Sequence, residues 1–454
     1  MIPDSRRAGI LLHPTSLPSG TLADAERWLD WLHEAGVGVW QMLPLGQPLI
    51  GLSPYQCASA FAANAALFGL EAAGQAEPDA AEFAAWCARQ AHWLDDFARF
   101  VVIKSMQGGA SWSDWPEPLR DRTPDALAAL DRDQAVALRK VRLAQYRVAL
   151  RWRAIRAAAA ARGIALFGDM PIFVAHDSAD VWARRGLFLL DAAGHPTVVT
   201  GVPPDYFSET GQRWGNPHYD WAAMQADGFA WWRQRLAAHF EWFDLVRIDH
   251  FRGLAAAWAI PAGEPTAIRG EWVPAPGEAL LQAIVDALGR LPLVAEDLGI
   301  ITPDVIALRH AFGLPGMAVL QFAFDDHGDN PHKPQNVTPD TVYYTGTHDN
   351  DTTAGWWAAQ PDAMRRKAMD QLGVNDRGSM LAAMIETVLA SPAALAVLPM
   401  QDVLGLGSTA RMNTPGTETG NWTWRFDWAD LPPDLAPRLL EQLQKTDRCE
   451  TTRT

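Results

Sequence analysis

Arg247 and Asp249 lie two residues apart in a mostly apolar stretch, residues 243–253 (FDLVRIDHFRG). Side chains alternate along a strand, so this stretch, as a short buried strand, turns both of them to one side and Val246 and Ile248 to the other. A guanidinium beside a carboxylate keeps the carboxylate ionised and fixes its rotamer. On this stretch alone, a structural salt bridge and a functional carboxylate remain equally open interpretations.

Further acidic residues follow apolar runs, at the points where other strands are expected to end. They are Asp169, Glu296 or Asp297, Asp349 and Asp402. Taken singly, each is explained by a helix cap or a solvated loop. A set of such acids at the carboxyl ends of strands in one barrel indicates an active site instead.

Two kinds of chemistry use such a set. Asp and His clusters bind Mg²⁺ or Mn²⁺, but Arg247 would compete with the cation, and no H-x-x-x-H or H-x-H spacing occurs. Glycosyl transfer needs one ionised carboxylate below the sugar and one protonated carboxyl beside the leaving oxygen. Asp249 suits the first role. Glu296 suits the second, because its apolar neighbours raise the pKa of a carboxyl. We therefore expect no metal and no cofactor.

The elements that must position these residues alternate between strands and helices. Apolar runs predict eight strands, starting near residues 8, 37, 164, 243, 291, 316, 342 and 394. Eight β/α units close into a (β/α)₈ barrel, the TIM barrel of the α/β class. A doubly wound sheet is the alternative, but no G-x-G-x-x-G turn follows the first strand.

We expect one catalytic barrel over residues 1–454, interrupted twice. Residues 51–162 are Ala-rich and predict a helical insertion after the second strand. Residues 175–226 predict a smaller insertion after the third strand, with a β-hairpin (187–191 with 197–200) and a long aromatic loop (203–221). The aromatic residues of that loop favour a function over disorder.

The composition narrows the class of partner. A net charge of −15 argues against nucleic acid and anionic membranes, so the basic run 139–156 is interpreted as a solvated helix face. Three widely spaced cysteines match no metal or disulfide pattern and indicate a reducing compartment. Without a signal-like N-terminus or an 18-residue apolar span, the prediction is a cytoplasmic protein. Several of the 21 tryptophans lie in Gly/Pro-rich loops, where flat aromatic faces suit sugar rings.

Three segments, 247–253, 295–299 and 347–350, resemble signature segments of the 4-alpha-glucanotransferases (amylomaltases or disproportionating enzymes), relatives of the alpha-amylases. The resemblance extends over about residues 8–430 and includes residues 168–174, 177–182, 203–221, 411–417 and 420–424.

The resemblance implies a retaining enzyme that moves alpha-1,4-glucan segments from a maltooligosaccharide to the 4-hydroxyl of glucose or another glucan. It makes Asp249 the nucleophile, Glu296 the general acid/base and Asp349 the residue that grips the 2- and 3-hydroxyls of the sugar. The implied binding residues are Arg247, which orients the nucleophile, Tyr55, Asp169 and His348 around the donor sugar, and Tyr206, Phe207, Trp214, Asn413 and Pro415 on the acceptor side. A monomer or weak homo-oligomer is expected.

One position departs from the family pattern, because the second β/α loop reads GLSPY (51–55), with Leu52 where the family usually has Asp or Asn. Any binding role assigned to that position is therefore in doubt. Three other interpretations stay open. They are a retaining alpha-glucan hydrolase, a glucan-binding barrel without activity, and a metal-dependent barrel enzyme.

Overall fold

The centre of the protein is a barrel of short parallel strands whose order in space follows their order in the chain. The computed structural model describes residues 6–49, 51–70, 77–204, 208–417 and 419–449. The sheet runs β10-β11-β12-β1-β2-β3-β6-β9. Its strands are β1 (Arg7–Leu11), β2 (Val39–Gln41), β3 (Ala165–Pro171), β6 (Leu245–Asp249), β9 (Leu293–Ala295), β10 (Gly316–Val319), β11 (Thr341–Tyr344) and β12 (Leu395–Pro399).

The first and last strands of this sheet, β10 and β9, meet at a seam. The backbone N–H of Ala295 donates to the carbonyl of Pro315 (2.9 Å). The barrel is therefore nearly closed, and the prediction of eight strands in a (β/α)₈ barrel is confirmed.

Strand register explains which side chains point into the barrel. Phe167 pairs with Leu245, and both belong to the buried cluster that fills the barrel interior. Two residues further on, Asp169 pairs with Arg247, so these side chains face the same interior. The outward-facing Gly168 lies against a ring, since a Cβ there would be 2.4 Å from an atom of Phe243.

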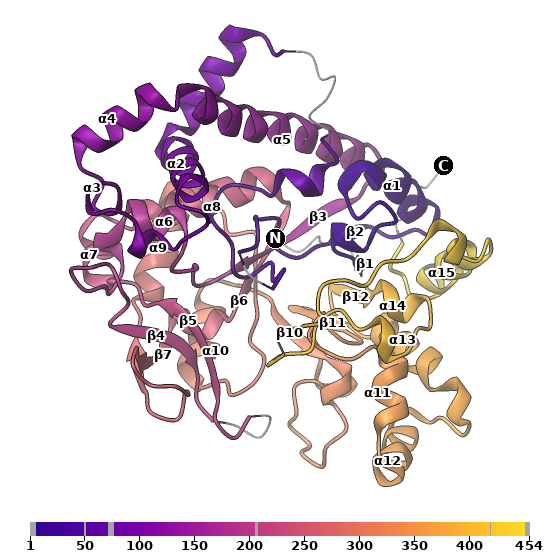
Figure 1. Cartoon of the computed structure of the whole chain (residues 1–454). Helices are drawn as coiled ribbons and strands as arrows, with labels where there is room; N and C mark the ends of the chain where they lie inside the picture. The colour runs from indigo at the N-terminus through magenta and orange to yellow at the C-terminus, as the bar shows by residue number, and fades with distance from the viewer. Residues whose placement is uncertain (1–5, 50, 71–76, 205–207, 418, 450–454) are drawn as a thin grey trace.

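Helices surround this barrel (Figure 1). The helices outside the two long connections described below are α1 (Ala25–Glu34), α9 (Gly277–Leu288), α10 (Pro303–Ala311), α11 (Thr353–Ala359), α12 (Asp362–Leu372), α13 (Met380–Ala390), α14 (Met400–Val403) and α15 (Leu435–Lys445). Their apolar faces, such as Trp28 and Leu32 of α1, pack in one large buried cluster with the outward-facing residues of the strands.

The long connection between β2 and β3 is helical. It contains α2 (Ala80–Met106), α3 (Glu117–Arg120), α4 (Pro124–Asp133) and α5 (Ala135–Ala161). The basic run lies on α5, where its arginines bind acids of neighbouring elements: Arg142 with Asp95 (3.0 Å), Arg151 with Glu26 (2.5 Å) and Arg156 with Asp244 (2.6 Å). These ion pairs fasten α5 to the rest of the chain. That residues 51–162 form a subdomain remains a prediction.

The connection between β3 and β6 contributes to a second sheet. It contains α6 (Ala179–Ala183), β4 (Val198–Val202), β5 (Gln212–Pro217), α7 (Trp221–Ala226) and α8 (Ala230–Trp242), and the chain after β6 adds β7 (Ala256–Pro261) and β8 (Glu271–Pro274). The four strands pair in the order β5-β4-β7-β8.

The expected hairpin is shorter than the sequence indicated. It consists of one bridge, Leu190 with Pro196, and the strand expected at 197–200 pairs instead with β5 and β7. Part of the expected aromatic loop is thus strand β5, and β7 and β8 were not anticipated.

Leu52 has a left-handed backbone (φ 61°), and its side chain is 60% exposed. A left-handed conformation costs a residue with a Cβ about 1–2 kcal/mol, and asparagine tolerates it best among ordinary residues. Leu52→Asn should therefore raise the free energy of unfolding by about 1 kcal/mol in urea titrations. Leu52→Ala is the matched control, because it removes the exposed side chain but keeps the strain. Equal stability of the two variants would contradict this account.

Candidate active site

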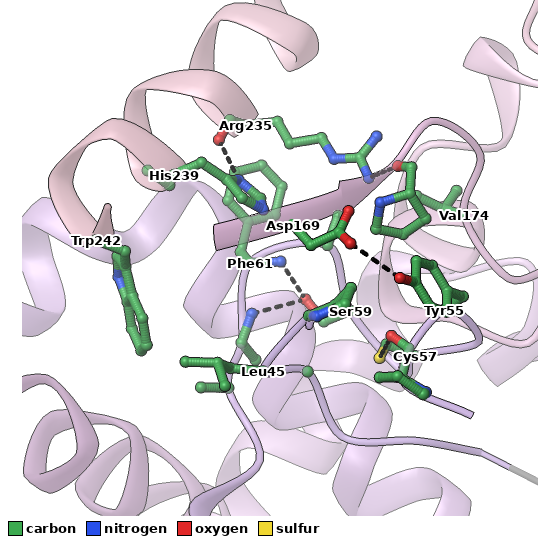
Figure 2. A pocket seen from close by; sticks show the side chains of 18 of the residues that line it. Leu45, Tyr55, Cys57, Ser59, Phe61, Asp169, Val174, Arg235, His239 and Trp242 are labelled. Atoms are coloured by element: carbon green, nitrogen blue, oxygen red, sulfur yellow. Dashed lines mark hydrogen bonds between the residues drawn. The ribbon is translucent and has the colours of Figure 1, made fainter. Parts of the chain in front are cut away.

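Inside the barrel, at the ends of β3 and β6, charged side chains form a row joined by ion pairs. The Arg247 guanidinium binds Asp169 Oδ2 through Nη1 (2.7 Å) and Asp249 Oδ1 through Nη2 (2.8 Å). Tyr55 donates its hydroxyl hydrogen bond to Asp169 Oδ2 (2.9 Å; Figure 2). Arg247 and Asp169 are buried, whereas the side chain of Asp249 is 31% exposed. Of these three charged side chains, Asp249 is therefore the one that a ligand can reach.

Asp249 is held among several charges. Burial raises its pKa to about 8, against the opposing effect of the Arg247 guanidinium, and the carboxylates of Asp169, Glu296 and Asp349 add to the rise. Because Arg247 contacts Asp249 directly, the ionised form of this carboxyl is the better paired one. Because the carboxylate of Glu296 raises the pKa of Asp249, the two carboxyls bind protons as a pair.

Glu296 follows β9 at the position that points inward. Its Oε2 accepts from the backbone N–H of His250 (2.7 Å), and its Oε1 accepts from that of Leu298 (2.9 Å). Burial raises the pKa of Glu296, although Arg247 and these two donors oppose the rise. His250 has a left-handed backbone (φ 54°), which places its N–H toward Glu296 directly after Asp249. The loop after β6 thus positions both carboxyls.

Two other candidate acids have structural contacts instead. Asp297 accepts from the N–H of Met317 (2.7 Å) and pairs with Arg309 (3.3 Å), which fixes the β9–β10 seam. Asp402 is buried and accepts from the hydroxyls of Thr345 (2.5 Å) and Thr353 (2.6 Å). Of the two adjacent acids, Glu296 lies toward His250 and Asp297 toward the β9–β10 seam, and Asp402 connects β12 to the residues after β11.

Asp349 lies on the loop after β11, next to Asn413 and His348. Asn413 donates to its Oδ1 (2.6 Å), and His348 Nε2 lies 3.3 Å from its Oδ2. Arg411 donates to the Asp349 carbonyl (2.7 Å) and to the Asn413 carbonyl (2.7 Å), which connects the two loops. Sequence reasoning placed Asn413 in the site but gave Arg411 no role.

An aromatic cluster covers one side of the site. The Tyr55 and His348 rings stack at 5.4 Å, and Trp422 lies 6.1 Å from Tyr55 and 6.0 Å from His348. Burial lowers the pKa of His348, so the ring is neutral. The Tyr55 hydroxyl donates its hydrogen bond to Asp169, so His348 donates from Nε2 to the Tyr55 oxygen (2.9 Å). Trp422 was not anticipated as a site residue, although its segment carried the resemblance.

The predicted acceptor-side residues have different outcomes. Trp214, on β5, meets the His250 ring edge-on, with centroids 4.8 Å apart. Pro415 lies in an exposed turn two residues after Asn413. Tyr206 and Phe207 lie outside the described residues. The structure thus brings Trp214 next to the Asp249–Glu296 pair.

Two features are absent from the part of the chain that the structure describes. No group of three or more His, Cys, Asp or Glu side chains is arranged to hold a metal ion. Nor is any described helix both long and apolar enough to cross a membrane.

Comparison with known proteins gives consistent results. A model of the glycoside hydrolase 77 family, described as 4-alpha-glucanotransferase, matches residues 11–77 and 67–430. The 4-alpha-glucanotransferase of Thermus thermophilus is 46% identical over 98% of this chain and 99% of its own, and that of Synechocystis is 45% identical over 93% and 94%. An amylomaltase from Streptococcus agalactiae, solved in complex with acarbose, superposes with a TM-score of 0.93 at 32% identity, covering 98% of this chain and 100% of that one.

Proposed function

We propose that this chain, which belongs to the 4-alpha-glucanotransferase family, transfers alpha-1,4-glucan segments through a covalent glycosyl–Asp249 intermediate. The donor is a maltooligosaccharide, and the acceptor is the 4-hydroxyl of glucose or another glucan. The observation that supports this most is the pair of Asp249, bound to the Arg247 guanidinium, and the partly buried Glu296, whose carboxylate accepts from the backbone N–H groups of His250 and Leu298.

In the first half of the reaction, Asp249 attacks the anomeric carbon while Glu296 gives its proton to the leaving oxygen. Asp249 is the ionised partner because Arg247 contacts it at 2.8 Å, so the proton of the pair resides on Glu296. The bond to the leaving glucan breaks as the bond to Asp249 forms. The shortened donor then leaves with the proton.

In the second half, Glu296 removes the proton from the 4-hydroxyl of the acceptor, which attacks the anomeric carbon and releases Asp249. Two inversions give net retention of configuration. Asp349, held by the Asn413 side chain, grips the 2- and 3-hydroxyls of the sugar. Asp169, His348 and Tyr55 surround the same sugar, and Arg247 orients the nucleophile.

Activity should depend on pH as a bell-shaped curve. The active form carries one proton on the Asp249–Glu296 pair. As pH falls, Asp249 is also protonated and the nucleophile is lost; as pH rises, the pair loses its last proton and the acid is lost. We expect kcat/KM for maltotriose to decline on both sides, with the alkaline limb above the ordinary pKa range of a carboxyl group. A profile that keeps rising above pH 9 would exclude a shared proton.

The test of transfer uses maltotriose as the sole substrate. Glucose together with a ladder of longer maltooligosaccharides indicates transfer. Glucose and maltose alone indicate a hydrolase on the same barrel, and no turnover indicates a glucan-binding protein. Full activity in excess chelator removes the metal-dependent alternative.

We assign to β5 the exclusion of water from the glycosyl–Asp249 intermediate. Trp214 lies against His250, whose N–H binds Glu296, and Asn216 accepts from the Gln56 side chain (3.0 Å). Trp214→Ala should therefore raise the ratio of hydrolysis to transfer several-fold in the maltotriose assay. An unchanged ratio would show that β5 does not shield the intermediate. The cytoplasmic location and the monomeric or weakly oligomeric state remain predictions.

A further inference from the structure

A pocket of about 70 Å³ lies behind the wall of the active site formed by Tyr55 and Asp169. It is bounded by the loop after β2, the end of β3 and the helix α8 (Figure 2). From α8 it is lined by Arg235, Ala238, His239 and Trp242. We call it the side pocket. Its walls are mainly apolar, and none of the proposed catalytic steps uses it.

Two buried polar atoms of its lining have no hydrogen-bond partner among the described residues. They are Oδ1 of Asp169 and Nε of Arg235, and each of these residues is 1% exposed. Figure 2 draws Asp169 between Tyr55 and Arg235. One atom is an acceptor and the other a donor. A buried polar group without a partner is rare in proteins, and ordered water commonly satisfies it.

Arg235 is unusual for a buried cation. Within 4 Å it has no carboxylate partner among the described residues; its Nη1 donates to the Ile172 carbonyl (3.0 Å) and its Nη2 to the Pro171 carbonyl (2.5 Å). Its charge lies 5.2 Å and 5.1 Å from the ring centres of Trp231 and Trp232. These contacts hold Arg235 at the carboxyl end of β3, the strand that carries Asp169.

We propose that the side pocket holds ordered water that accepts a hydrogen bond from Arg235 Nε and donates one to Asp169 Oδ1. The volume suffices, since one water needs roughly 10–15 Å³. Arg235 is then a positioning residue. Its water bridge fixes the carboxylate of Asp169, whose other oxygen binds Arg247, and Arg247 binds Asp249. The position of the nucleophile thus depends on α8.

The water itself is tested by a high-resolution crystal structure of the full chain, a measurement that does not depend on the proposed function. The expected result is an ordered water within hydrogen-bond distance of both atoms. A dry pocket, or direct protein partners for both atoms, would overturn the proposal.

The effect on Asp249 rests on the proposed function and is tested by filling the pocket. Ala238→Leu puts a larger side chain into the pocket, and Ala237→Leu is the matched control on the adjacent, equally half-buried position outside the lining. We expect Ala238→Leu to lower kcat for maltotriose about tenfold with little change in KM, because a displaced nucleophile slows chemistry more than binding. The acid limb of the pH profile should move up by about half a unit, since an Asp169 without its donor favours protonation of Asp249.

Two outcomes separate this inference from the proposed function. If the unmodified protein makes no maltooligosaccharide ladder, the proposed function fails whatever the pocket contains. If it makes the ladder, and Ala238→Leu retains the kcat and pH profile of Ala237→Leu, the positioning role of Arg235 is wrong. If Ala238→Leu does not fold, the crystal structure of the unmodified protein still tests whether water bridges Arg235 and Asp169.

Discussion

Replacing Asp249 with asparagine should lower kcat/KM for maltotriose by about four orders of magnitude or more. Asparagine has nearly the same shape and still accepts a hydrogen bond from Arg247, but it cannot form the glycosyl ester. Transfer and hydrolysis should be lost together, because both pass through the same intermediate. A variant that lost transfer but kept hydrolysis would contradict a role for Asp249 as nucleophile.

Stability provides the control for this variant. The raised pKa values of Asp249 and Glu296 mean that the folded pair binds a proton more tightly than the unfolded chain does. The contribution of the pair to stability therefore falls as pH rises from about 4 to about 8 and is constant above. Asparagine has no such charge, so Asp249→Asn should melt at a higher temperature than the parent at pH 8 and at a similar temperature near pH 4. A lower melting temperature at pH 8 would mean that the lost activity reflects misfolding.

Glu296→Gln should lower kcat/KM for maltotriose by about three to four orders of magnitude, since the leaving oxygen can no longer be protonated. The loss should depend on the leaving group. Fluoride leaves without a proton, so an alpha-maltosyl fluoride should still glycosylate the Glu296→Gln variant and release fluoride in a rapid burst. Asp249→Asn should release no fluoride above background. The reverse pattern would exchange the two assigned roles.

The barrel could be predicted from the sequence because its strands are buried on both faces and are therefore apolar throughout. Strand β12, with the sequence LAVLP, is buried at every position. The acids proposed to react end such runs, so their approximate places could be predicted as well. Strands β7 and β8 were missed because they belong to a second sheet, and β8 is largely exposed and has no apolar run.

Direction within the site was harder to predict than location. Glu296 and Asp297 are adjacent, and only the register of β9 turns Glu296 inward and Asp297 toward Arg309. Asp402 also follows an apolar run, but its carboxylate accepts hydrogen bonds from two threonine hydroxyls. Trp422 and Arg411 contact site residues from a loop far along the chain, and such contacts depend on tertiary packing.

The covalent intermediate is the central claim, and trapping it is the most direct test. The Glu296→Gln variant is mixed with an alpha-maltosyl fluoride in the absence of acceptor, quenched with acid and digested, and its peptides are analysed by mass spectrometry. The predicted result is one maltosyl group on the peptide that contains Asp249, absent when Asp249 is also replaced by asparagine. A maltosyl group on a different residue, or fluoride release without any adduct, would contradict the mechanism proposed for this enzyme.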